Sequence, residues 1–189
     1  YNYNYDDPFS SCLWYNIKNL GLAQILVAKQ RAATTYRGWC FIAHNGSTAN
    51  GLHVQLIHNY TAPQLWISTY VKLGASVAAN TWYHACFTYD GSGDASGVNI
   101  YFNGVNQSNL TIEGNNLSGN SVADTTAQFA LGARLLTNGT AITYFNGSLD
   151  DVRIWNKTLS AAEVSELYNN SQKLNLMIIN LKLMNLDLI

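Results

Sequence analysis

The stretch NTWYHACFTYDG, residues 80–91, decides the fold and raises the question that narrows the function. From Trp82 to Tyr89 an apolar set of residues alternates with a more polar set. A period of two residues is typical of a β-strand with one buried face. Cys86 lies on the more polar face with His84 and Thr88, so it is either a small hydrophobe or one end of a disulfide. A disulfide would place the protein in an oxidising compartment.

Similar strand-like runs lie on both sides of this stretch, separated by turns rich in Gly and Asn. They are ILVAK (25–29), GWCFIAH (38–44), GLHVQLIH (51–58), QLWISTYV (64–71), VNIYFNG (98–104), AQFALGA (127–133) and SLDDVRIW (148–155). Many short strands with scarcely any helix predict an all-β fold, an antiparallel β-sandwich of the jelly-roll kind.

One helix is expected near the C-terminus, in TLSAAEVSELYNN (158–170). Ser160 is the predicted N-cap, and Glu163 three residues later completes a capping box. We expect a short helix against one end of the sandwich and place the domain at residues 1–171. The tail 172–189 ends in LNLMIINLKLMNLDLI, which has no clean period. An extra edge strand, the start of a truncated element and a non-native extension all stay open for it.

Composition excludes some classes of partner. The chain has 189 residues, enough for one domain, with 11% charged residues and a net charge of −1. This balance gives no electrostatic footprint for nucleic acid or for an anionic membrane surface. We therefore expect no nucleic-acid partner. No apolar run is long enough to span a bilayer, so we also expect no membrane insertion. The chain begins with Tyr rather than Met, as a processed product or an excised fragment would.

Nine Asn-x-Ser/Thr sequons are present, at Asn45, Asn59, Asn106, Asn109, Asn116, Asn138, Asn146, Asn156 and Asn169. Composition alone would supply about three or four, treating the motif as a product of residue frequencies. Two interpretations stay open: a glycosylated secreted protein, or the co-occurrence of Asn, Gly, Ser and Thr in turns.

Three segments, in order, resemble a known family. DDPFSSCLWYNI (6–17), NTWYHACFTYDGSG…GVNIYFNG (80–104) and FNGSLDDVRIWNKTLSAAEVSELY (145–168) are similar to the laminin-G-like branch of the concanavalin A-like lectin/glucanase superfamily. Within it, HACFTYD resembles the pentraxin signature His-x-Cys-x-Ser/Thr-Trp, with Tyr89 in place of Trp. FSSCLW resembles the pentraxin strand that carries the partner cysteine. Pentraxin likeness also raises the expectation of a homo-oligomer, although no interface residue can be named.

The resemblance implies a disulfide between Cys12 and Cys86. Strand periodicity agrees, because Cys12 and Trp14 face away from the core side of their strand, as Cys86 does in its own. Two cysteines on the same face of paired strands can meet disulfide geometry. Cys40 is then left as a free core thiol. The alternative is a cytosolic protein with three reduced thiols.

Catalysis is not expected. A glycosidase normally needs two carboxylates flanking the scissile bond. The three glutamates do not supply such a pair: Glu163 and Glu166 belong to the predicted helix, Glu113 lies alone in a loop, and the Glu-x-Asp-x-x-Glu strand of the superfamily's glucanases has no match here. No nucleophile elbow, phosphate loop or helical pair of metal-binding histidines is present either.

Calcium is the one cofactor that the resemblance implies, with Asp150 in GSLDDVRIW as the candidate ligand. The pentraxin double-calcium site has no match, because 29–38 lacks the expected Asp-Asn and 131–141 lacks an acidic cluster. Asp90 and Asp94 are interpreted as turn residues.

Outward-facing residues of the strands suggest a ligand-binding surface rich in aromatic, amide and imidazole groups. Its candidates are Trp14, His53, Gln55, Trp66, Tyr70, His84 and Tyr101. If they share one sheet, they form a shallow surface suited to sugar rings. Two alternatives are a second core covered by other segments, and binding in the loops at one end of the sandwich.

These observations favour an extracellular or cell-surface module that binds carbohydrate or a glycosylated partner without catalysis, with calcium as a candidate cofactor. A structural or adhesive module of a surface assembly or virion is the alternative, and a glucanase-type hydrolase is third. Fold resemblance does not by itself fix function.

Overall fold

The computed structural model describes residues 1–32, 35–43, 50–117 and 119–183, with side chains up to residue 172. His44 and the sequon at Asn45 lie outside the described residues. The strands are β1 (Phe9–Ile17), β2 (Gln24–Gln30), β3 (Gly38–Ala43), β4 (Gly51–Asn59), β5 (Leu65–Lys72), β6 (Trp82–Tyr89), β7 (Val98–Phe102), β8 (Val105–Asn106), β9 (Thr111–Asn115), β10 (Phe129–Leu131), β11 (Arg134–Leu135), β12 (Ala141–Ile142) and β13 (Gly147–Trp155). Two 3₁₀ turns, Gly74–Ser76 and Ala95–Gly97, and one helix, α1 (Ala161–Leu183), complete the elements.

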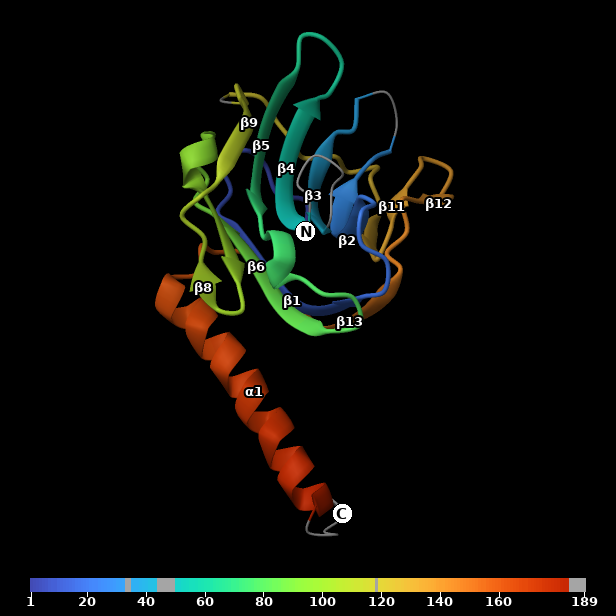
Figure 1. Cartoon of the computed structure of the whole chain (residues 1–189). Helices are drawn as coiled ribbons and strands as arrows, with labels where there is room; N and C mark the ends of the chain where they lie inside the picture. Colours follow the sequence, from blue (N-terminus) through green and yellow to red (C-terminus); the bar gives the residue numbers. More distant parts are fainter. Residues whose placement is uncertain (33–34, 44–49, 118, 184–189) are drawn as a thin grey trace.

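Two antiparallel sheets lie face to face, as the alternating strands predict (Figure 1). The five-stranded sheet has the order β13-β1-β6-β7-β8, and the six-stranded sheet has the order β10-β2-β3-β4-β5-β9. β11 and β12 form a separate two-stranded hairpin. The predicted antiparallel β-sandwich is confirmed.

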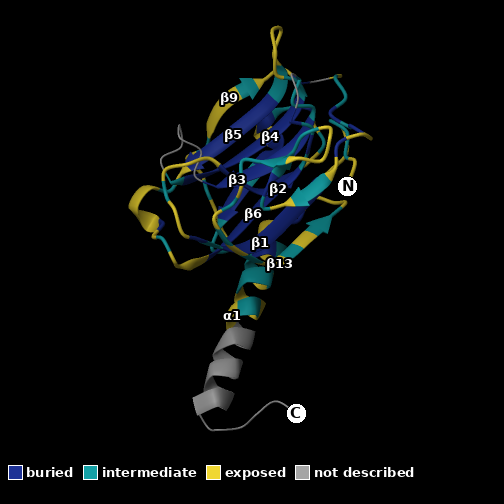
Figure 2. Cartoon of the chain, turned by 90° about the vertical axis from the view of Figure 1, so that its right-hand side faces the viewer, coloured by how far each residue is buried: buried dark blue, intermediate teal, exposed yellow. Residues whose placement is uncertain are grey.

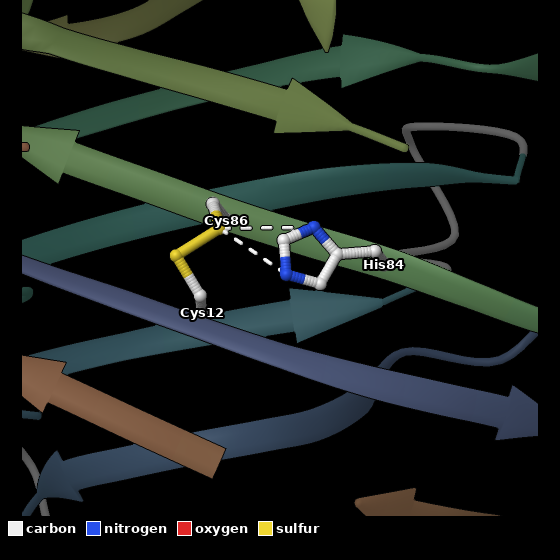
Figure 3. A group of neighbouring side chains, drawn as sticks. All are labelled: Cys12, His84 and Cys86. Atoms are coloured by element: carbon white, nitrogen blue, oxygen red, sulfur yellow. Dashed lines mark hydrogen bonds between the residues drawn. A yellow bond between two sulfur atoms is a disulfide. The ribbon is translucent and has the colours of Figure 1, made fainter. Parts of the chain in front are cut away.

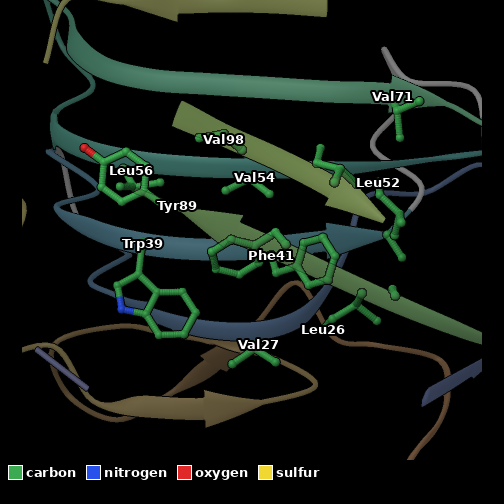
Figure 4. Close-up of a cluster of buried hydrophobic side chains, with 14 of the residues drawn as sticks. Leu26, Val27, Trp39, Phe41, Leu52, Val54, Leu56, Val71, Tyr89 and Val98 are labelled. Carbon is green, nitrogen blue, oxygen red and sulfur yellow. The ribbon is translucent and has the colours of Figure 1, made fainter. Parts of the chain in front are cut away.

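The core fills the space between the sheets with the apolar half of each alternating strand (Figure 2). Leu52, Val54 and Leu56 of β4 face inward, and Tyr89 of β6 meets them from the other sheet (Figure 4). Phe87 packs edge-on against Phe41 at 5.1 Å between ring centroids. Edge-to-face rings stabilise a core beyond the apolar area they bury.

Local signals place the elements that matter for the outer faces. The turn between β7 and β8 has Asn103 at φ +49° and Gly104 at φ +77°. Two left-handed residues are what a two-residue hairpin needs, which explains the Asn-Gly pair. Helix α1 starts with the predicted capping box, since Ser160 N–H donates to Glu163 Oε2 at 2.7 Å and Glu163 N–H donates to Ser160 Oγ at 3.3 Å.

Helix α1 is longer than expected. It continues to Leu183, so residues 172–183 extend the helix and do not form the edge strand considered for the tail. Alternating Leu and Asn in this segment obscure the helical period, yet no Gly or Pro interrupts the helix once the capping box has started it. Among the described residues, no helix is both long and apolar enough to cross a membrane.

Candidate ligand-binding site

The seven predicted ligand-binding residues divide between the two outer faces of the sandwich. Trp14, His84 and Tyr101 belong to β1, β6 and β7 of the five-stranded sheet. The other four belong to β4 and β5 of the six-stranded sheet, and they are His53, Gln55, Trp66 and Tyr70. The single surface considered from the sequence is therefore wrong, because alternation reports which residues face outward but not on which sheet.

The outer face of the five-stranded sheet is covered by the start of helix α1. Leu159 and Val164 pack on Cys12, Cys86 and Tyr101 in a second apolar cluster. The ring of Tyr168 lies 5.7 Å from that of Trp14 and 5.8 Å from that of His84. Trp14, His84 and Tyr101 are consequently only 7%, 3% and 3% exposed. These three residues form the covered second core that was the alternative to a binding surface.

The disulfide implied by the family resemblance lies within this second core. Cys12 and Cys86 pair directly across β1 and β6, and their sulfurs are bonded (Figure 3). Cys40 is free and buried, as expected. Within the described residues, Cys12, His84 and Cys86 are the one group of three potential metal ligands that lie close together. Because both sulfurs are used in the disulfide, they offer no thiolate to a metal.

His84 lies beside that disulfide, with Nε2 3.8 Å from the sulfur of Cys86 (Figure 3). Burial lowers the pKa of His84 to about 4, against the smaller opposing effect of Asp151. The imidazole is therefore neutral at physiological pH, as an imidazole inside an apolar cluster should be.

The outer face of the six-stranded sheet carries an open pocket of about 230 Å³. Its floor is formed by β2, β3 and β4 through Ile25, Ile42, Gln55 and Ile57. Its rim is formed by Ala23, Tyr36, Tyr60, Arg134 and Thr143. Of the predicted residues, Gln55 lines this pocket. An apolar floor with a few convergent polar groups is the usual character of a small-ligand site.

Aromatic rings continue the rim along the sheet. Tyr60 packs edge-on against Tyr36 and against Trp66, each at 5.3 Å between ring centroids. Tyr60 is 41% exposed, so part of its ring faces solvent at the pocket. The predicted residue Trp66 thus contributes by supporting Tyr60 and does not itself line the pocket.

Arg134 reaches the pocket from the β11–β12 hairpin. Leu135 of this hairpin bridges to Arg31, and Ala32 N–H donates to the Leu135 carbonyl at 3.0 Å, which anchors β11 at the end of β2. The Arg134 guanidinium carbon lies 5.2 Å from the centre of the Tyr36 ring, a cation–π contact. Its Nη2 donates to the sulfur of Cys40 at 3.5 Å.

Sequence reasoning missed Tyr36, Tyr60, Arg134 and Thr143. All four lie in loops or at the start of a two-residue strand, where hydrophobic periodicity carries no signal. Tyr36 also has φ +50°, a left-handed backbone that is uncommon for a residue with a side chain.

His53 and Tyr70 lie on the same outer face but not in the pocket lining. His53 Nε2 is 2.7 Å from Ser68 Oγ, and Ser68 Oγ donates to Glu113 Oε2 at 3.1 Å. The Glu113 carboxylate lies 3.6 Å from that same Nε2, whereas a catalytic triad needs the acid on the other ring nitrogen. His53 and Ser68 are fully buried, and burial, with Arg134 as a second cause, lowers the pKa of His53 to about 4. This group is a structural network.

The geometry around Asp150 does not assemble a calcium site from side chains. Asp150 is exposed on the edge strand β13, and its Oδ1 accepts the Asp151 N–H at 2.7 Å. The Asp151 carboxylate pairs with Arg153 at 2.6 Å. No group of three acidic, His or Cys ligands includes Asp150 within the part of the chain that the structure describes. Calcium at Asp150 stays a prediction.

Comparisons with known proteins agree with this architecture. No curated protein matches the chain. Its structure is similar to the native heptameric SAP-like pentraxin from Limulus polyphemus, with a TM-score of 0.57 at 18% identity over 84% of this chain and 68% of that one. It is also similar to the CBM40 of the Ruminococcus gnavus IT-sialidase, solved with α2,3-sialyllactose, with a TM-score of 0.60 at 16% identity over 86% of this chain and 83% of that one.

A third similar structure is the binding domain of Paraclostridial Mosquitocidal Protein 1, with a TM-score of 0.62 at 18% identity. The match covers 90% of this chain but 38% of that one. Identities this low show the shared fold alone, whereas the family model described as "Concanavalin A-like lectin/glucanases superfamily" (Laminin_G_3) matches residues 2–165. The chain belongs to the concanavalin A-like lectin/glucanase superfamily, in its laminin-G-like branch.

Proposed function

We propose that this protein is a non-catalytic binding module that holds a carbohydrate, or the glycan of a glycosylated partner, in the pocket on the six-stranded sheet. The observation that carries the proposal is the open pocket itself, with an apolar floor and a rim of tyrosine rings and polar groups. The solved CBM40 structure with α2,3-sialyllactose supports it, because that protein shares the fold and binds a glycan.

The chemistry of the rim suits sugars. The apolar face of a sugar ring packs on an aromatic ring, while hydroxyl groups need hydrogen-bond partners. Tyr36 and Tyr60 offer the rings, and Gln55 and Thr143 offer polar groups beside them. At about 230 Å³ the pocket is smaller than the roughly 300–1,000 Å³ common for drug-sized ligands, so it suits one or two sugar rings and not a long chain.

Hydrolysis has no support at this pocket. Its lining contains neither Asp nor Glu, and glycoside hydrolysis normally needs two carboxylates flanking the bond. The Glu113 carboxylate accepts a hydrogen bond from Ser68 Oγ, and Glu163 caps helix α1. We therefore propose that this pocket binds its ligand without cleaving it.

An extracellular or cell-surface location is part of the proposal. The Cys12–Cys86 disulfide supports it, because such bonds form and persist in oxidising compartments. A homo-oligomer stays a prediction, which light scattering of the purified protein decides.

A glycan array tests the function. We expect the wild-type protein to bind a defined set of glycans and Tyr60→Ala to lose affinity by about tenfold, since an aromatic contact is worth up to about 1.5 kcal/mol. Trp82→Ala is the matched control, because Trp82 is 44% exposed, close to the 41% of Tyr60, but lies on the five-stranded sheet.

Equal effects of the two substitutions, or no glycan bound by the wild type, would contradict the proposal. Binding to a protein partner that persists after enzymatic removal of its glycans would instead support the adhesive module considered from the sequence. Release of reducing sugar from a bound β-glucan would reveal a hydrolase.

A further inference from the structure

Within the residues that the structure describes, no carboxylate pairs with the positive charge of Arg134. In the described residues, the ion pairs are Arg31–Asp124, Arg153–Asp151 and Lys157–Glu163, and the contact of Glu113 is with the neutral His53. Arg134 belongs to none of these pairs of the described residues. The internal segments outside the described residues, 33–34, 44–49 and 118, contain no Asp or Glu in their sequence. The pocket lining contains none either.

The contacts that Arg134 does make orient its guanidinium without satisfying it. The guanidinium of Arg134 lies over the Tyr36 ring, and the Cys40 sulfur accepts a hydrogen bond from its Nη2. A thiol is a weak acceptor, and burial raises the pKa of Cys40, so this sulfur stays uncharged. Nε of Arg134 is buried and has no hydrogen-bond partner among the described residues. A guanidinium has five N–H donors, so most of its capacity remains for a ligand.

A partly buried cation without a counter-ion is costly unless an anion pairs with it. The planar fork of a guanidinium matches a carboxylate, which accepts two parallel N–H bonds. Arg134 stands at the rim beside Tyr36, with Tyr60 and Gln55 also lining the pocket. A ligand that fills the pocket can therefore place one sugar ring against the tyrosines and its carboxylate on Arg134.

We propose that the pocket selects sugars that carry a carboxylate and that Arg134 is the residue that determines this specificity. The inference rests on the proposed function and names the ligand class for the same pocket. Sulfated sugars present a different anion, tetrahedral and not planar, and they serve as a separate arm of the test.

The first experiment measures binding of the wild-type protein to α2,3-sialyllactose, to its carboxylate methyl ester and to lactose by calorimetry. A hydrogen bond to a charged group contributes enough that we expect the ester and lactose to bind about tenfold to a hundredfold more weakly. We also expect the affinity for sialyllactose to fall as salt rises, because part of it is a charge interaction. Galactose 6-sulfate, galacturonate and galactose extend the comparison to a sugar whose one anion is a sulfate and to a second carboxylated sugar.

The second experiment replaces the cation. Arg134→Gln should bring sialyllactose and its methyl ester to equal, weak affinity, and Arg134→Lys should restore only part of the difference because it keeps the charge but not the fork. Arg153→Gln is the control, an exposed arginine whose partner is Asp151 on the other sheet. Melting curves establish that each variant is folded; the ester comparison on the wild type needs no variant at all.

The outcomes distinguish a failure of the carboxylate specificity from a failure of the proposed function. The carboxylate specificity would be overturned if the wild type bound sialyllactose and its ester with equal affinity and also bound galacturonate and galactose with equal affinity. If Tyr60-dependent binding of neutral glycans persisted in that case, the proposed function would stand. Tighter binding of the sulfated sugar would overturn the choice of a planar anion, and no glycan binding of any kind would overturn both proposals together.

Discussion

Removing the Cys12–Cys86 disulfide should destabilise the protein strongly without changing its fold. The bond links residues 74 positions apart in the sequence. In the chain-entropy model, a cross-link of that span removes freedom from the unfolded chain equivalent to about 4 kcal/mol of stability at room temperature. For a chain of this size, that free energy corresponds to a fall in the melting temperature of roughly 8–16 °C. We expect the two sheets to persist without the link, because the main core between them contains neither Cys12 nor Cys86.

Urea unfolding with and without a reductant measures this free energy. Cys12 and Cys86 are 2% and 0% exposed, so reduction should proceed through the unfolded chain, and the equilibrium midpoint should move to lower urea. Thiol titration in denaturant should find one reactive thiol before reduction, that of Cys40, and three afterwards. A Cys40→Ala variant is the matched control, because it should respond to reductant as the wild type does.

Two results would refute this reasoning. Coincident unfolding curves after complete reduction would show that the link does not restrict the unfolded chain. Three reactive thiols in the untreated protein would show that the bond is absent in solution, and the extracellular location would then lose its main support.

Three further predictions follow from the second core and from the calcium question. Gly104→Ala should lower the free energy of unfolding by about 1–3 kcal/mol, because φ is +77° there and an added Cβ would lie 3.0 Å from Tyr168. Gly74→Ala should lower it by less, because Gly74 has φ +55° but open space around it, and chemical denaturation compares the two variants. The free energy of unfolding should fall as the pH drops from about 6.5 to about 4, because the histidines of the unfolded chain bind protons in this range and the buried His53 and His84 do not. His84→Gln should make this pH dependence less steep, and an unchanged pH dependence would contradict the prediction. Glycan binding should survive EDTA because the pocket lining has no acidic residue, whereas a calcium-induced rise in melting temperature that Asp150→Asn abolishes would establish the predicted ion site.

Much of the fold could be predicted because its signals are local. Alternation in residues 82–89 predicts a strand, and Ser160 and Glu163 predict a helix start. The disulfide could be predicted for a related reason: resemblance and facing direction both put Cys12 and Cys86 on one side of their strands.

The site was harder to predict because its placement depends on long-range pairing. β1 lies between β6 and β13, and its partner residues in β13 are more than a hundred positions away in the sequence. Nothing in the periodicity of β4 or β6 reveals that their outward residues end on opposite faces. Tyr36, Tyr60 and Arg134 line one pocket, yet Tyr60 and Arg134 follow Tyr36 by 24 and 98 positions in the sequence. All three lie outside the long strands, so no periodic pattern marks them as neighbours.

The two outer faces differ because of what the chain lays over them. Both start as outward residues of half-buried strands. Over one, helix α1 places Val164 and Leu167 in the cluster of the disulfide and Tyr168 against Trp14, and these side chains bury that face. Over the other, the β11–β12 hairpin places Arg134, whose charge cannot be sealed against apolar side chains at an acceptable cost. Because no carboxylate of the described residues pairs with Arg134, this face has to stay open to water or to an anion, and this is the physical reason to look for the ligand there.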